Sequence, residues 1–108
     1  MTLDTSKLRL MFVKHLQEHS AVFERSVDCI NQSTSGKPGI ESAQIAAIID
    51  RSHRLSGVAG TFGEHELTEM ARNLEVFLSE NVEPDLSDLG LHLNRLIDKI
   101  STVIEHHQ

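Results

Sequence analysis

Apolar side chains recur every three or four residues along most of this sequence, and this period constrains the fold more than any other feature. A spacing of i, i+3, i+4 and i+7 places side chains on one face of an α-helix, whereas a half-buried strand alternates every second residue. No stretch shows a convincing period of two. The predicted inward-facing residues form four groups: Leu8, Phe12, Leu16, Phe23, Val27 and Ile30; Ile45, Ile48, Ile49, Ser52, Leu55 and Ala59; Leu67, Met70, Ala71, Leu74, Phe77 and Leu78; and Leu86, Leu89, Leu93, Leu96, Ile97, Ile100, Val103 and Ile104.

The four groups are separated by residues that end or start helices. Residues 33–39 contain Ser, Gly and Pro and predict a loop, while the glycines in 60–63 suit a left-handed helix stop. Pro84 and Asp85 together make a helix start. The predicted helices therefore cover about 5–33, 41–61 and 64–80, followed by a last helix that starts at 84–85.

The short connections between these helices predict how they assemble. Four amphipathic helices joined in this way favour an all-α fold, an antiparallel four-helix bundle in up-down-up-down order. Thr5 or Asp4 can cap the first helix. At 108 residues the chain is long enough for one domain with a modest core, so we expect a single domain over 1–108.

The overall charge and the cysteine content exclude several classes of protein. The net charge of −6 argues against a nucleic-acid backbone as the main partner. The single Cys29 cannot form an internal disulfide and fits a reducing compartment. No segment reaches the ~20 consecutive apolar residues that span a membrane, and the residues after Met1 lack the basic and apolar regions of a signal peptide. We therefore expect a cytoplasmic domain that binds neither nucleic acid nor membrane.

His53 and Gly57 form the most informative local pair. Glycine in a helix interior costs about 1 kcal/mol relative to alanine, and residues four apart lie one turn above each other. Gly57 therefore leaves the imidazole of His53 open to a bulky visitor. On a helical wheel His53 lies roughly 100° from the centre of the core face, so solvent should reach its ring. Neutral imidazole is a good nucleophile, and its N–P adduct can pass a phosphoryl group onward.

Phosphoryl transfer also needs positive charge near the transferred group. Arg51 and Arg54 are the cations nearest to His53 in the sequence, and Arg72 could face it from the third helix. The residues alone also fit a bland interpretation, an exposed histidine beside incidental glycines, because the chain contains 7 histidines.

The other histidines suggest no site of their own. His15 and His19 are spaced i, i+4 like a metal-binding pair, but no third ligand follows at a recognisable spacing, so we expect two solvated helix histidines. His106-His107 is expected to have no partners. No strand or Gly-Lys-Ser/Thr sequence accompanies the glycines, so neither an ATP site, a metal nor a cofactor is expected. Ala47 and Val58 are predicted to face outward, where they could belong to a small docking patch.

A longer motif resembles the histidine phosphotransfer (HPt) domain family. The family pattern is His-x-Leu-Lys-Gly, followed by small residues, a second glycine turn and a helix ending in Leu-Glu. The Ala-Gly-Thr-Phe-Gly run is also similar to the phosphotransfer domain of chemotaxis kinases. The residues that carry the resemblance are His53-Arg54-Leu55-Ser56-Gly57, Ala59-Gly60-Thr61-Phe62-Gly63, Leu67, Ala71, Leu74 and Glu75.

The resemblance implies roles for several of these residues. His53 would be phosphorylated, Gly57 would provide clearance, and Glu75 would hydrogen-bond the other ring nitrogen, although on sequence alone Glu75 equally fits an ordinary solvated glutamate. The family usually has lysine where this chain has Ser56, which offers a neutral hydroxyl in place of a cation. Arg54 or Arg72 would then have to supply the positive charge, with a different reach and geometry from lysine.

The implied function is that of a phosphoryl carrier in a two-component phosphorelay, without enzymatic turnover. A receiver domain of a hybrid histidine kinase would supply the phosphoryl group and the receiver of a response regulator would take it, with Mg²⁺ supplied by the receiver. One alternative is a detached kinase-type domain, phosphorylated from ATP by a separate catalytic domain. Another is a helical adaptor that binds a partner without accepting phosphate. We expect a monomer, although an apolar strip on the first or fourth helix could pair two bundles.

Overall fold

The computed structural model describes residues 5–32, 41–81 and 83–107, and these residues form four helices without a strand among them. The predicted helix boundaries are confirmed to within two residues. The predicted loop at 33–39 and the possible cap Asp4 lie outside the described residues. The helices are α1 (Thr5–Asn31), α2 (Ser42–Thr61), α3 (His65–Glu80) and α4 (Leu86–His107).

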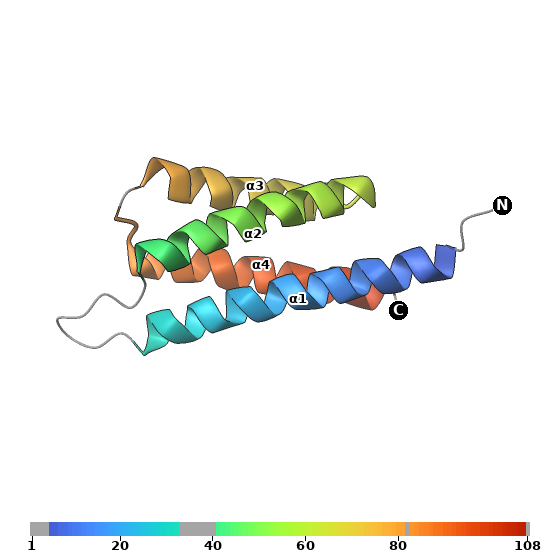
Figure 1. Cartoon of the computed structure of the whole chain (residues 1–108), viewed down its shortest axis with the longest axis horizontal. Helices are drawn as coiled ribbons and strands as arrows, with labels where there is room; N and C mark the ends of the chain where they lie inside the picture. The colour runs from blue at the N-terminus through green and yellow to red at the C-terminus, as the bar shows by residue number, and fades with distance from the viewer. Residues whose placement is uncertain (1–4, 33–40, 82, 108) are drawn as a thin grey trace.

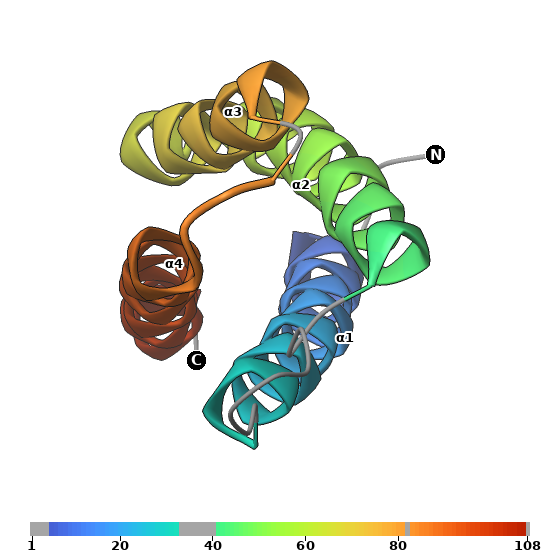
Figure 2. The same cartoon turned by 90° about the vertical axis from the view of Figure 1, so that its left-hand side faces the viewer.

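The four helices surround a common axis. Figure 1 draws consecutive helices running in opposite directions along the long axis of the molecule, and Figure 2 shows them end-on around one core. Helix α1 packs against α2 and α4, and α3 packs against the same two helices. The structure is therefore a four-helix bundle, as the apolar period predicts.

The core is built from the predicted apolar faces. Within each helix, side chains at the predicted spacing are withdrawn from solvent, and each fully buried leucine or phenylalanine contributes about 1.5–3 kcal/mol through the hydrophobic effect. Val58 also packs partly against the core, so the prediction that it faces outward is wrong in part, whereas Ala47 is exposed. The buried cluster consists of Phe12, Leu16, Phe23, Ile48, Leu55, Ala59, Leu67, Ala71, Leu74, Leu78, Leu89, Leu93, Leu96, Ile100 and Val103.

The turn between α2 and α3 determines how these two helices meet. Gly63 has a φ of +74°, the left-handed conformation that suits glycine. The Gly63 N–H donates to the Gly60 carbonyl at 3.2 Å, and the Glu64 N–H donates to the Ala59 carbonyl at 2.9 Å. This pair of bonds is the Schellman arrangement, which ends α2 and turns the chain directly into α3. The predicted glycine stop is therefore confirmed at Gly63.

The end of α4 is anchored, contrary to the prediction for the C-terminal histidines. His107 Nε2 lies 2.9 Å from Glu64 Oε1, and its ring packs edge-on against Phe12 with centroids 5.0 Å apart. Phe12 also stacks on Phe62, with ring centroids 4.2 Å apart. These contacts join α1, α4 and the α2–α3 turn, because the turn brings Glu64 and Phe62 to the same end of the bundle as His107.

Helix α4 begins with a side-chain cap. Asp85 Oδ1 accepts hydrogen bonds from the backbone N–H groups of Ser87 at 2.8 Å and Asp88 at 3.1 Å. An aspartate at this position satisfies N–H groups that have no partner within the helix. The predicted helix start at Pro84 and Asp85 is thus confirmed, with Leu86 as the first helical residue.

Candidate functional site

His53 lies near the middle of α2, on its outward face. Ser52, Leu55 and Ser56 on the same helix are buried, and this leaves the neighbouring side of the helix to solvent. The His53 side chain is 76% exposed. The ring is therefore available to a partner of any size, as the helical wheel predicts.

Glu75 holds the ring of His53 from the neighbouring helix α3. Its Oε2 lies 3.0 Å from His53 Nδ1, and its side chain is 26% exposed. A carboxylate only accepts hydrogen bonds, so Nδ1 carries the proton and donates it. In a neutral imidazole the other nitrogen, Nε2, then has a free lone pair. The contact thus selects both the orientation and the tautomer of the ring and leaves Nε2 as the nucleophilic atom.

Gly57 is not required by the packing of the described residues. A Cβ atom placed there would meet nothing within 4 Å, and the residue is exposed in the middle of a helix. A helical glycine with free space around it is less favourable than alanine by about 1 kcal/mol. Within the described part of the chain, alanine would therefore fit at this position.

Ser56 does not present its hydroxyl beside the imidazole. The side chain is only 8% exposed, and its Oγ donates a hydrogen bond of 2.7 Å to the backbone carbonyl of His53. The hydroxyl is thus directed along the helix backbone, so it cannot also face a group bound on His53 Nε2 without giving up this bond. The neutral hydroxyl at the position of the family's lysine is therefore bonded to the backbone of His53.

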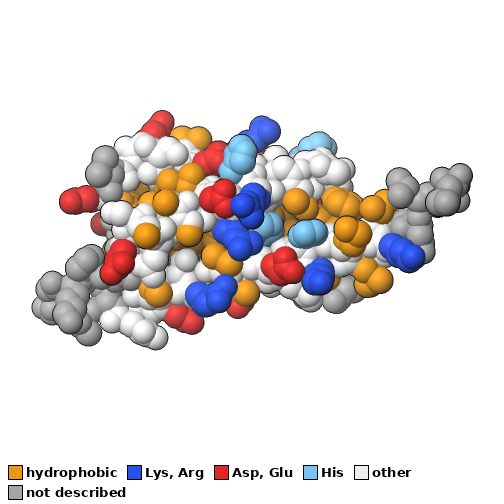
Figure 3. Space-filling view, viewed as in Figure 1, with side chains coloured by type: hydrophobic (Ala, Val, Ile, Leu, Met, Phe, Trp, Pro, Cys, Tyr) orange, Lys and Arg blue, Asp and Glu red, His pale blue; other side chains and the backbone are white. Residues whose placement is uncertain are grey.

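Two of the arginines expected near His53, Arg54 and Arg72, have exposed side chains. Arg54 is exposed, and its Nε lies 3.1 Å from Asp50 Oδ2 one helical turn earlier. Arg72 is exposed on α3 and makes no hydrogen bond or ion pair within the described residues. It precedes Glu75 by three residues, which places both on one face of α3. Figure 3 shows Arg, Lys and His side chains grouped across the middle of the face over α1 and α2.

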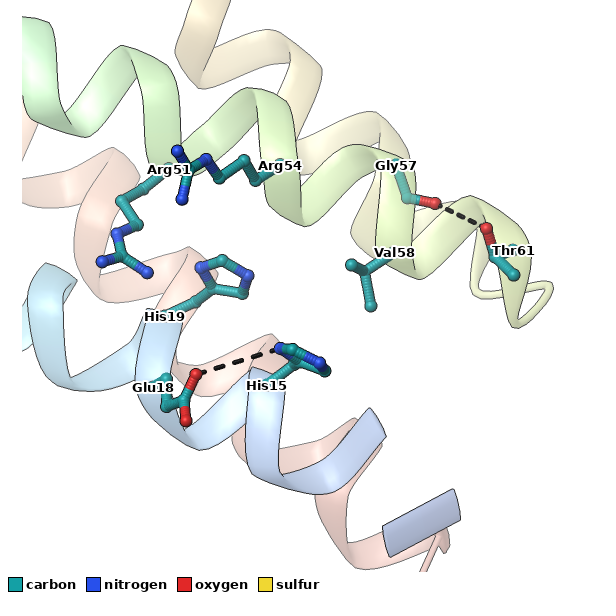
Figure 4. A pocket seen from close by; sticks show the side chains of 8 residues that line it. All are labelled: His15, Glu18, His19, Arg51, Arg54, Gly57, Val58 and Thr61. Carbon is teal, nitrogen blue, oxygen red and sulfur yellow. Dashed lines mark hydrogen bonds and ion pairs between the residues drawn. The ribbon is translucent and has the colours of Figure 1, made fainter. Parts of the chain in front are cut away.

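A groove opens between α1 and α2 next to this face (Figure 4). Its volume is about 480 Å³. Gly57 belongs both to this groove and to the surface beside His53, so the two are continuous. The groove is lined by His15, Glu18, His19, Arg51, Arg54, Gly57, Val58 and Thr61.

His19 in this groove was predicted to be solvated, and that prediction is wrong. The residue is 4% exposed, and its Nδ1 has no hydrogen-bond partner in the described residues. Burial, and next the positive charge of Arg51, lower the pKa of His19 from 6.5 to about 4. The signal was present in the sequence, because His19 occupies the position between Leu16 and Phe23 in the apolar period of α1.

Of the two histidines that were expected to be solvated, His15 is the one at the surface. Its Nδ1 lies 3.9 Å from Glu18 Oε2.

Over 5–32, 41–81 and 83–107, no group of three or more His, Cys, Asp or Glu side chains is arranged to hold a metal ion. In the same ranges, no helix has the length and apolar character needed to cross a bilayer.

The chemistry available at this site is that of an exposed, oriented imidazole. Its Nε2 can attack an electrophilic phosphorus, and the Glu75 carboxylate can stabilise the positive ring that results. A family model described as Hpt domain matches residues 7–104, nearly the whole chain. No curated protein and no solved structure matches the sequence.

Proposed function

Because the chain belongs to the Hpt domain family, whose members carry phosphoryl groups on histidine in two-component phosphorelays, we propose that His53 is the phosphorylated residue. The hydrogen bond between His53 Nδ1 and Glu75 is the observation that carries this assignment. Among the histidines of the described residues, only His53 has both an exposed ring and a tautomer fixed by a hydrogen bond. We further propose that residues 1–108 form a single domain, and that the protein is a monomer and works in the cytoplasm.

The proposed donor is the phosphoaspartate of a receiver domain. His53 Nε2 attacks the phosphorus with its lone pair while the bond from phosphorus to the aspartate oxygen breaks, and the aspartate leaves as a carboxylate. No proton moves in this step, since Nδ1 keeps its hydrogen bond to Glu75. The phosphorylated ring is cationic, and the Glu75 carboxylate stabilises that charge.

The onward step reverses the same bonds. An aspartate oxygen of the second receiver attacks the phosphorus, the N–P bond breaks, and its electron pair returns to Nε2. We propose that each receiver supplies the acidic pocket and the Mg²⁺ that neutralise the phosphoryl oxygens, so that this chain contributes the nucleophile. Gly57 leaves space for the rim of the receiver pocket to approach Nε2, and Arg54 and Arg72 add positive charge around it.

The direct test is phosphorylation of the full chain by a histidine kinase, a receiver domain and labelled ATP. We expect an acid-labile, alkali-stable label on the wild type and none on His53→Gln. His65→Gln is the matched control, because His65 is also exposed but lies at the start of α3, and it should label like the wild type. Circular dichroism verifies that both variants remain helical.

The two alternative functions correspond to other results of this experiment. A label that appears with kinase and ATP but without any receiver would identify a detached kinase-type phosphotransfer domain. A folded protein that stays unlabelled with several receivers, yet binds one of them equally well after His53→Gln, would be an adaptor and would refute the assignment of His53.

A further inference from the structure

The groove between α1 and α2 holds a polar group that the phosphotransfer chemistry does not use. His19 is almost completely withdrawn from solvent, yet Nδ1 has no partner in the described part of the chain. Most buried polar groups in proteins are hydrogen-bonded, and an unpaired one is destabilising. The ring points from α1 toward α2 across the groove (Figure 4). Because Nδ1 is itself closed off from solvent, a ligand in the groove would meet the other ring nitrogen, Nε2.

The tautomer of His19 follows from its surroundings. A neutral imidazole carries one proton, and a buried N–H without an acceptor is less tolerable than a lone pair without a donor. The proton therefore belongs on Nε2, the nitrogen that remains to face the groove. Burial and the nearby Arg51 keep the ring neutral at physiological pH by lowering its pKa to about 4. His19 thus offers the groove one neutral N–H donor.

Arg51 supplies the uncompensated charge of this groove. It is half-buried and forms no ion pair within the described residues, whereas the other cation, Arg54, is paired with Asp50 at 3.1 Å. The Glu18 carboxylate lies near His15, at 3.9 Å. The groove therefore has one free positive charge and one N–H donor, on a chain whose net charge is −6.

This combination fits a carboxylate better than a phosphate dianion. A carboxylate carries one negative charge and accepts hydrogen bonds at two oxygens, which matches one guanidinium and one imidazole N–H. A phosphate dianion carries two negative charges, so one of them would remain unneutralised in a groove that also contains the Glu18 carboxylate. The groove is also continuous with the surface around His53 through Gly57, so a protein docked over His53 covers its opening.

We propose that the α1–α2 groove accepts the carboxylate of an acidic side chain from the receiver domain that docks over His53, bound by Arg51 and His19. This inference rests on the proposed function and adds an anchoring contact beside the reacting atoms. Arg51 and His19 are positioning residues, because they touch neither the phosphoryl group nor His53. They set how tightly the receiver binds, and the chemistry on Nε2 proceeds without them.

The test separates binding of the phosphorylated receiver from the rate of transfer to His53. We expect Arg51→Gln to raise the receiver concentration at half-maximal rate about tenfold, with the limiting rate changed less than about twofold. Arg25→Gln is the control, because Arg25 is exposed on α1 outside the groove and its loss changes the net charge equally. His19→Leu should act like Arg51→Gln while keeping the apolar packing of α1.

Other results overturn the proposal. If Arg51→Gln leaves the half-maximal concentration unchanged, or shifts it no more than Arg25→Gln does, the groove does not anchor the receiver. If the limiting rate alone falls, Arg51 acts on the chemistry and the assignment as an anchor is wrong. Both results leave labelling of His53 intact, so they are distinct from failure of the proposed function.

A second measurement decides the case in which no receiver phosphorylates His53. Sodium acetate is titrated into the full chain at constant ionic strength while the ring resonances of His19 are followed by NMR. A saturable shift that is lost in Arg51→Gln and kept in Arg25→Gln would establish the carboxylate site while the proposed function fails. Without a saturable shift of His19, the groove is not a carboxylate site.

Discussion

At the scale of single residues, the site depends on a few side chains whose neighbours define their chemistry. His53 is exposed like an ordinary surface histidine, and the contact with Glu75 Oε2 at 3.0 Å distinguishes it. Ser56 occupies the family's lysine position but bonds to the His53 carbonyl. If His53 carries a phosphoryl group as proposed, the positive charge near that group comes from the arginines or from the receiver.

Replacing Glu75 tests the selection of the tautomer. In Glu75→Gln the amide can either accept from or donate to Nδ1, so the preference for a lone pair on Nε2 is lost. We expect the rate of transfer to His53 to fall by about tenfold to hundredfold. Nitrogen-15 NMR of the imidazole should show a single tautomer in the wild type and a mixture in the variant.

Glu80→Gln provides the control for this change, because Glu80 is exposed at the end of α3. It should leave both the rate and the tautomer unchanged. If Glu75→Gln keeps a single Nε2 lone pair and the full rate, the hydrogen bond does not have the proposed role.

Gly57→Ala tests whether the clearance beside His53 has a functional purpose. The helix should become more stable by about 0.5–1 kcal/mol, because alanine has the higher helix propensity and nothing obstructs its Cβ. Transfer from the receiver should nevertheless slow down, since the added methyl group lies where the receiver approaches. Thermal or urea unfolding and the labelling assay measure the two effects separately.

Gly90→Ala is the matched substitution, because Gly90 is also helical and an added Cβ would likewise meet nothing within 4 Å. It should stabilise the protein by a similar amount and leave transfer unchanged. Equal transfer rates for both variants would show that Gly57 is not a clearance residue.

At the scale of helices, the α2–α3 connection is what brings the two halves of the site together. His53 and Glu75 are 22 residues apart and meet because the chain reverses within three residues after α2. Gly63, in the left-handed conformation, makes that short reversal possible. The spacing from His53 to Glu75 in the sequence therefore depends on the length of this turn.

Gly63→Ala should destabilise the protein by about 1 kcal/mol, because an L-residue is strained at a φ of +74°. Gly60→Ala is the contrasting change, since its Cβ would make an ordinary contact of 3.8 Å with Thr68 Oγ1 in helical backbone. We expect Gly60→Ala to be neutral or stabilising in urea unfolding. A Gly63→Ala variant as stable as the wild type would contradict the role of the turn.

At the scale of the whole molecule, the bundle places a polar groove between α1 and α2, on one side of its apolar core. The net charge is −6, but arginine and histidine side chains gather over α1 and α2 (Figure 3). The buried ring of His19 makes the free energy of unfolding depend on this arrangement of charges, because burial and then the nearby Arg51 lower its pKa. It faces Arg51, Arg54 and His15, which oppose its protonation, and Glu18, which favours it.

The pH dependence of unfolding should reveal this burial. The pKa of His19 is 6.5 in the unfolded chain and about 4 in the folded protein. As the pH falls below 6.5, the unfolded state binds a proton that the folded state does not, so stability decreases with falling pH until about 4. This one group contributes up to about 1.4 kcal/mol per pH unit.

His19→Leu should flatten this slope and raise stability near neutral pH, because it removes an unpaired buried nitrogen. Urea unfolding of both proteins between pH 6.5 and 4.5 measures the effect. Lys99 lowers the pKa of Glu66 from its ordinary value, and the pH dependence that this carboxyl adds is the same in both proteins and cancels in the comparison. Equal slopes for wild type and His19→Leu would show that His19 titrates normally in the folded protein.

The sequence by itself determined the four helices, the core faces, the glycine stop at Gly63 and the outward position of His53. These features depend on spacing within one helix or turn, where backbone geometry alone fixes which residues share a face. Only the tertiary structure decided that Arg51 lies near the buried His19, that Glu64 pairs with His107 and that Glu75 reaches His53 Nδ1. Such contacts join different helices, and they depend on how the helices pack and on the side-chain rotamers, which a helical period does not specify.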